Sequence, residues 1–133
     1  MERLLGRFAP HLFAILRVIA GVMFALHGTQ KLFGWPGDKP PVGAMLIVAA
    51  GVIEAFGGAL IAIGFLTRWA AFVCSGTMAV AYFYAHAGDG FFPTLNGGEL
   101  AVLYCFLWLF VAAHGAGIWS VDEFIAREER AGS

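Results

Sequence analysis

Four long apolar stretches alternate along the chain with short polar or glycine-rich segments. Two charge-free runs, 69–88 and 100–121, contain no Asp, Glu, Lys or Arg over 20 and 22 residues. A membrane-spanning helix needs about 20 mostly apolar residues, so either run is long enough to cross a bilayer. The other two stretches are each interrupted once, by Arg17 and by Glu54. The pattern predicts spans over residues 8–27, 42–65, 69–88 and 99–117.

Helix-breaking residues separate the predicted spans. Residues 35–41 contain three prolines and cannot continue a helix. Residues 67–68 are expected to form a tight turn, and residues 88–98 are rich in Gly, Pro and Asn. A charged tail over 120–133 opens with a capping box, in which Ser120 precedes Glu123 by three residues. We therefore expect a short charged helix after the last span.

The composition supports a membrane protein. Of 133 residues, 60% are hydrophobic and 13% are charged, whereas a soluble domain carries about 25% charged residues. One small core cannot bury that much apolar side chain, which argues against a soluble enzyme or a disordered segment. The net charge of −1 provides no basic stripe for nucleic acid. We predict a single all-α membrane domain over 1–133, a four-transmembrane-helix bundle.

The basic residues predict the orientation of the bundle. Five lie on the side of the termini and the second turn, and two lie on the opposite side: Arg3, Arg7, Arg68, Arg127 and Arg130 against Lys31 and Lys39. Both termini are therefore expected in the cytoplasm of a bacterium, with the chain crossing its inner membrane four times. A cleaved signal peptide is the alternative for the first span, but Arg17 interrupts it and no small-x-small cleavage site follows.

Two opposite charges are predicted near the middle of the membrane. Arg17 lies ten residues before position 27, and Glu54 lies twelve residues after position 42. With a rise of about 1.5 Å per residue, these depths are about 15 and 18 Å. Because a lone charge in hydrocarbon is costly, we expect an Arg17–Glu54 ion pair. It could be a structural clamp or part of a ligand or proton site, or Glu54 could be protonated and merely hydrogen-bonded.

A second group of polar residues is expected at the outer ends of three helices. The predicted catalytic residues are His27, Lys31, His86 and Glu99, and the predicted cofactor-binding residues are Arg17, Glu54 and Asn96. Each has a simpler explanation: Lys31 could extend to the headgroups, Asn96 and Glu99 could form an N-cap pair, and either His could be a surface hydrogen-bonding residue. The apolar segment 90–93 is expected to fold over this group as a lid.

Three chemistries could use these residues. A quinone headgroup needs a His or Lys donor for its carbonyl oxygens, an acid to relay protons, and an apolar slot for its tail. His27 and His86 could instead ligate a haem, or join Glu99 around a metal ion. No HxxxH or HxxE spacing supports a metal site, and Cys74 and Cys105 form no CxxC motif. We therefore favour quinone as the cofactor and expect no bound metal.

The order of the polar motifs resembles the DoxX family of small bacterial membrane proteins. The residues that carry the resemblance are Arg17, Gly21, FALHG (24–28), KLFG (31–34), EAFGG (54–58), Gly64, TRWAA (67–71), His86, GFFP (90–93) and NGGE (96–99). The family is named for its similarity to the membrane subunit of an archaeal thiosulfate:quinone oxidoreductase. Some mycobacterial relatives are associated with a superoxide dismutase and a sulfurtransferase in a membrane oxidoreductase complex. The resemblance implies four membrane helices and a redox or quinone-linked role, and it assigns no residue roles.

These inferences converge on a membrane subunit of a redox system that interacts with quinone or a redox partner. Besides membrane lipid, the expected partners are further copies of the chain or subunits of a larger complex, and a soluble redox protein. The alternatives are a non-enzymatic anchor or assembly subunit and a small-solute transporter.

Overall fold

A computed structural model describes residues 1–37 and 43–133, and every regular element in these ranges is helical. The elements are α1 (Glu2–Leu5), a 3-10 turn η1 (Gly6–Phe8), α2 (Ala9–Phe33), α3 (Met45–Ile63), α4 (Thr67–Ala85), a 3-10 turn η2 (Ala87–Asp89), α5 (Pro93–Asn96), α6 (Glu99–His114) and α7 (Val121–Gly132). The prediction of an all-α chain is confirmed. Lys39, which the orientation argument used, lies outside the described residues.

Two of these helical segments are both long and apolar enough to cross a membrane, Gly6–Phe33 and Met45–Ile63. The other two predicted spans differ from them in composition and length. Helix α4 has 19 residues, as α3 does, but it begins at Thr67 and so includes Arg68, and Ser75 and Thr77 add further polar groups. Helix α6 is strongly apolar but has only 16 residues, because Gly115 ends it before the charge-free run is complete.

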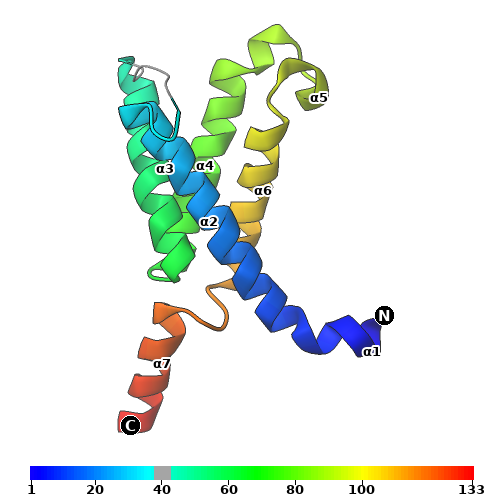
Figure 1. Ribbon diagram of the computed structural model, residues 1–133, viewed down its shortest axis with the longest axis vertical. Coiled ribbons are helices and arrows are strands. Elements are labelled where there is room, and N and C mark those ends of the chain that lie inside the picture. Colours follow the sequence, from blue (N-terminus) through cyan, green and yellow to red (C-terminus); the bar gives the residue numbers. More distant parts are fainter. Residues whose placement is uncertain (38–42) are drawn as a thin grey trace.

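The four long helices form two closely packed pairs (Figure 1). Helix α2 packs along α3, and α4 packs along α6. Glycine makes the first pair close, because a Cβ on Gly21 would lie 2.8 Å from the carbonyl oxygen of Gly58. Small residues at such crossings let helix backbones approach each other in membrane proteins. The extensive contact between α2 and α3 fixes their relative register.

The buried core lies between the two pairs. It is built around four large side chains contributed by α2, α3 and α6: Phe24, Ile61, Tyr104 and Trp108. The rings of Tyr104 and Trp108 are stacked with centroids 5.5 Å apart. Many other large apolar side chains are exposed on the outside of the bundle, as expected where lipid replaces water. The packing of Phe24 of α2 against Tyr104 and Trp108 of α6 thus joins the two helix pairs.

Candidate functional site

Arg17 and Glu54 do not form the predicted ion pair. Arg17 lies 16 residues before the end of α2, whereas Glu54 lies only nine residues after the start of α3. At about 1.5 Å per residue their depths differ by about 10 Å. The prediction placed them level because it ended the first span at position 27 and began the second at 42. With the true helix ends, Arg17 falls beside the C-terminus of α3.

The guanidinium of Arg17 binds backbone carbonyl groups instead of a carboxylate. It donates to the carbonyl oxygens of Ile61 and Ala62, both at 2.6 Å, and to that of Trp119 at 2.8 Å. The last carbonyls of a helix have no partner within the helix, and the helix dipole favours a cation there. Arg17 therefore caps α3 and ties it to the segment before α7.

Two further charged residues cap helices at the same end of the bundle. The carboxylate of Asp122 accepts hydrogen bonds from the backbone N–H groups of Leu66 and Thr67, each at 2.9 Å, at the start of α4. Arg68 donates to the carbonyl oxygens of the last residues of α6, at 2.9 Å for Ala112 and 2.6 Å for Ala113. We call this the capped end. Its charges are bound to the helix backbone.

Helix α7 begins at the capped end, as the capping box predicted. The hydroxyl of Ser120 accepts a hydrogen bond from the backbone N–H of Glu123 at 3.2 Å. The Glu123 carboxylate pairs with Arg127 at 2.9 Å and Arg130 at 3.3 Å. The prediction of a short charged helix after the last span is confirmed.

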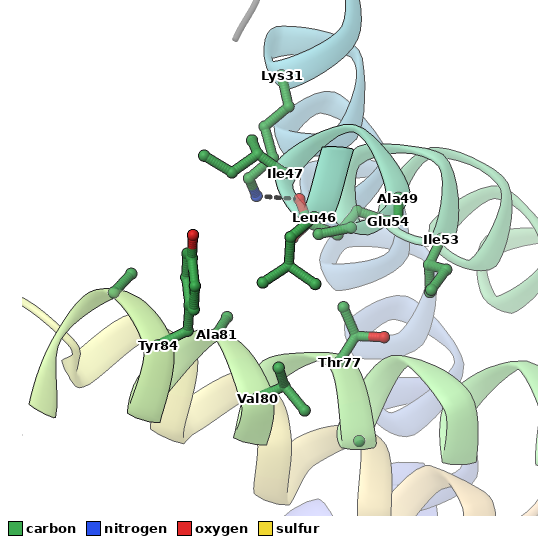
Figure 2. Close-up of a pocket in the computed structure, with 13 residues that line it drawn as sticks. Lys31, Leu46, Ile47, Ala49, Ile53, Glu54, Thr77, Val80, Ala81 and Tyr84 are labelled. Carbon is green, nitrogen blue, oxygen red and sulfur yellow. Dashed lines mark hydrogen bonds and ion pairs between the residues drawn. The ribbon is translucent and has the colours of Figure 1, made fainter. Parts of the chain in front are cut away.

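At the other end, Glu54 forms its ion pair with Lys31 (Figure 2). The Glu54 side chain is 1% exposed and that of Lys31 is 35% exposed. The Lys31 ammonium binds one carboxylate oxygen, Oε2, while Oε1 is buried and has no hydrogen-bond partner among the residues described. A buried polar atom without a partner costs free energy. Oε1 is therefore ready to accept a hydrogen bond from a ligand or a water molecule.

A pocket of about 240 Å³ adjoins this ion pair and is called the central pocket below. Its polar lining comes from three helices and the residue after α4: His27 and Lys31 of α2, Glu54 of α3, His86, and Tyr104 of α6. Three larger apolar residues and four small residues complete the walls: Phe24, Met78 and Leu100, with Ala81, Ala85, Gly97 and Ala101. The structure thus brings together three of the four predicted catalytic residues with one predicted cofactor-binding residue, Glu54.

A second cavity opens sideways between α3 and α4 and is called the lateral groove (Figure 2). Its volume is about 450 Å³. It shares Lys31, Glu54, Ala81 and Ala85 with the central pocket. Thr77 and Tyr84 contribute hydroxyl groups, and the rest of the lining is aliphatic or glycine. The Lys31–Glu54 pair therefore stands where a polar pocket meets an apolar groove.

The remaining predicted site residues lie outside the central pocket. Glu99 is exposed at the start of α6 and lines a separate surface depression. Asn96 is buried, but its amide serves the loop: it donates to the Gly90 carbonyl at 2.7 Å and accepts from the Gly98 N–H at 2.8 Å. Asn96 thus ends α5 and does not cap α6, whose N-cap is Gly98.

The predicted lid over the polar residues is also absent from this site. Phe91 and Phe92 are 72% and 65% exposed and do not line the central pocket. The Tyr82 hydroxyl donates to the carbonyl oxygen of Phe91, which holds the loop at the end of α4. Because this loop is tied to its own helix pair, it does not reach across to α2.

Residue types define what the central pocket can do. Lys31, Tyr104 and the two histidines can donate hydrogen bonds to a carbonyl oxygen, and Glu54 can accept one or hold a proton. Within residues 1–37 and 43–133, no three His, Cys, Asp or Glu side chains gather in a group that could hold a metal ion. The pocket therefore fits a small neutral group that carries both oxygen acceptors and hydroxyl donors.

The sequence pattern did not predict that Glu54 pairs with Lys31 and not with Arg17. Lys31 lies four residues after His27, on the same face of α2. A Lys side chain long enough to extend toward headgroups can equally extend back along its helix, and this places its ammonium against Glu54. Lys31 lies two residues before the end of α2 and Glu54 nine residues after the start of α3, and the sequence pattern alone did not locate these ends.

Comparisons with known proteins identify the family of this chain. Residues 12–87 match the family model for DoxX. A protein of Haemophilus influenzae, described as uncharacterized, is 45% identical over 125 residues, covering 89% of this chain and 93% of its own. No solved structure matches the chain. The matched region includes Arg17, Lys31 and Glu54, and the chain belongs to the DoxX family of membrane proteins.

Proposed function

We propose that this DoxX-family protein binds a quinone or quinol at the Lys31–Glu54 pair, as a membrane subunit of a redox system. The observation that carries the proposal is the buried Oε1 of Glu54, which has no hydrogen-bond partner among the described residues and lies beside a cationic donor. A quinol hydroxyl would complete the hydrogen bonding of Oε1, and a quinone carbonyl would accept from Lys31. One small site could therefore hold both forms of the same ring.

The residues of the central pocket divide the work in this proposal. Lys31 and His27 orient a carbonyl oxygen, while Glu54 accepts or returns a proton at the ring hydroxyl. Tyr104 forms a flat wall, since its ring is stacked on Trp108 and is 6% exposed. When bound, the quinone supplies reversible two-electron redox chemistry. The electron donor would be a separate protein or subunit.

The same proposal includes a four-span topology in a bacterial inner membrane. Both termini lie toward the capped end of the bundle (Figure 1), as four crossings require. Arg68 and the arginines of α7 also belong to that end, which favours its placement in the cytoplasm. The central pocket would then face the outer half of the bilayer.

Binding of ubiquinone-1 to the full chain in mild detergent tests the site. Isothermal titration calorimetry should give saturable binding to the wild type, weakened about tenfold or more by Glu54→Gln or Lys31→Met, because a charge-assisted hydrogen bond is lost. Glu99→Gln is the matched carboxyl control at the same end, and it should bind as the wild type does.

Three results would overturn the proposal. Absence of saturable binding to the wild type would favour the anchor or assembly role. Equal binding by the wild type and the Glu54→Gln and Lys31→Met variants would place the quinone elsewhere. If only Glu99→Gln lost binding, the site would lie at the start of α6 and not in the central pocket.

A further inference from the structure

The central pocket is too small for a whole long-chain amphiphile. Its volume is about 240 Å³, whereas pockets that enclose a drug-sized ligand have about 300–1,000 Å³. A single substituted ring can occupy such a space, but a ring with a hydrocarbon chain cannot. A ligand that carries a chain must therefore extend it out of the pocket.

The lateral groove provides the adjoining space for such a chain. It is the larger cavity, about 450 Å³, and begins at the same Lys31–Glu54 pair. Beyond this pair its walls carry Leu46, Ile47 and Ile53 on α3 and Val80 on α4 (Figure 2). Burial against these apolar walls is favourable for a hydrocarbon chain and not for a polar group.

Small residues set the width of the groove. Ala49 and Ala50 stand on the α3 side, and Gly76 stands on the α4 side. A Cβ added to Gly76 would meet no atom within 4 Å, so this glycine is not required by helix packing. It contrasts with Gly21 and Gly58, where an added Cβ would collide with the facing backbone. Gly76 is exposed, so the space beside it is the open side of the groove.

The charges at the junction indicate the kind of headgroup. Lys31 and Glu54 neutralise each other, and among the described residues lining the two cavities they are the only Lys, Arg, Asp or Glu. A carboxylate or phosphate headgroup would have to displace Glu54 from Lys31. A neutral headgroup can bind without breaking the pair, which separates a quinone from a fatty acid or phospholipid.

We infer that the ligand binds in two parts, with its ring in the central pocket and its hydrocarbon tail in the lateral groove between α3 and α4. This inference rests on the proposed function, because the ring site is the quinone site. The ligand enters from the lipid through the open side of the groove with its ring leading, and the tail that follows stays in the groove beside Gly76. Tail length therefore contributes to affinity.

The experiment compares two ligands that share one ring: a dimethoxy-methyl-benzoquinone without a tail and the same ring with a decyl tail. Both are titrated calorimetrically into the full chain in the same detergent. Gly76→Leu fills the groove from α4, and Ala49→Leu fills it from α3. Gly88→Leu is the matched control, because an added Cβ there also meets no atom within 4 Å and Gly88 lies outside both cavities.

The two groove variants should weaken binding of the decyl quinone about tenfold, because several buried methylene groups lose their contacts. Binding of the tail-less ring should change less than twofold, and Gly88→Leu should bind both ligands as the wild type does. Comparing variant with wild type for each ligand cancels the partitioning of the tail into detergent. Unchanged melting temperatures confirm that each variant is folded.

The alternative outcomes separate this inference from the proposed function. If both ligands bind the wild type and the groove variants keep full affinity for the decyl quinone, the tail lies elsewhere and the ring site stands. The groove would then hold a lipid acyl chain or a second copy, and a change in molecular mass of the groove variants would identify the copy. If neither ligand binds the wild type, the quinone proposal itself fails.

Discussion

The two ends of the bundle use charge in different ways. At the capped end, Arg17 and Asp122 bind backbone groups at helix termini, at distances of 2.6–2.9 Å. At the opposite end, which holds the central pocket and is called the pocket end below, Lys31 and Glu54 bind each other. One carboxylate oxygen of Glu54 is left unpartnered among the described residues. The contrast teaches that a buried charge in an apolar chain is not by itself a functional site. Arg17 Nε and Glu54 Oε1 are both buried without a partner among the described residues, but only Glu54 lines the central pocket and the lateral groove. An unpartnered polar atom that borders a cavity is therefore the better guide.

Helix α2 carries both kinds of cation. Arg17 has a planar group with five donors, which can satisfy several carbonyl oxygens at once, whereas the ammonium of Lys31 is a compact charge. The carbonyls at the end of α3 match the first, and the single carboxylate of Glu54 matches the second. The choice of Arg or Lys thus follows the acceptors at each end.

Removal of the Arg17 guanidinium should have the largest effect on stability. Arg17→Met deprives three carbonyl oxygens of their donor in a buried place, and we expect a loss of about 3 kcal/mol in the free energy of unfolding. Thermal or denaturant unfolding in detergent, followed by circular dichroism, measures it. Arg17→Lys should recover only part of the loss, and equal stability of Arg17→Met and wild type would show that the capped end does not hold the bundle together.

At the pocket end the single variants and the double variant should differ. Lys31→Met leaves the Glu54 carboxylate buried without a partner and should cost about 2 kcal/mol of stability at neutral pH. Lys31→Met combined with Glu54→Gln removes both charges and should regain most of this loss. The same unfolding assay measures Lys31→Met, Glu54→Gln and the double variant. If the loss in the double variant equals the sum of the two single losses, Lys31 and Glu54 are not directly coupled.

Asp122→Asn should destabilise the capped end less than Arg17→Met does. The amide keeps one acceptor oxygen for the two N–H groups at the start of α4, so we expect a loss of about 1 kcal/mol. Glu128→Gln on the same helix serves as the control for removing a carboxylate from α7. A loss as large as that of Arg17→Met would mean that Asp122 has a further structural role.

The smallest expected effect concerns Glu123 on α7. The hydrogen bond and the charge of Arg127, with the charge of Arg130, hold the pKa of the Glu123 carboxyl below its ordinary value of 4.5. A lowered folded-state pKa means that Glu123 stabilises α7 above pH 4.5 and that this contribution is lost as the pH falls through the folded-state value.

Carboxyl carbon NMR of the full chain should follow this titration directly. Arg127→Gln should raise the titration midpoint of Glu123, because the first and largest cause of the shift is removed. An unchanged midpoint in that variant would show that the pair seen at 2.9 Å does not persist in solution.

Much of the fold could be predicted from the sequence. Charge-free runs, prolines and the Ser120 capping box located the helical stretches and the tail helix, since each of these depends on local chemistry. The exact helix ends could not be read in this way. Helix α2 continues to Phe33 and α3 starts at Met45, and these limits depend on packing between the two helices.

The candidate site was predictable in its membership but not in its pairing. His27, Lys31 and His86 were placed together because alternating spans bring their ends to one side. A few residues of error at two helix ends were enough to assign Arg17 to Glu54 in place of Lys31. Glu99 was included for its position at a helix start, but the rotation of α6 that exposes it is set by the packing of Tyr104 and Trp108.

The unequal lengths of the helices have a consequence for the surrounding lipid. Helix α2 has 25 residues and α6 has 16, which correspond to about 37 and 24 Å along their axes. The hydrocarbon layer is about 30 Å thick, so in the proposed four-span topology α2 would tilt and the bilayer would thin beside α6. The protein would therefore be surrounded by an asymmetric annulus, with shorter acyl chains favoured on one flank, and its distribution among membranes would depend on their thickness.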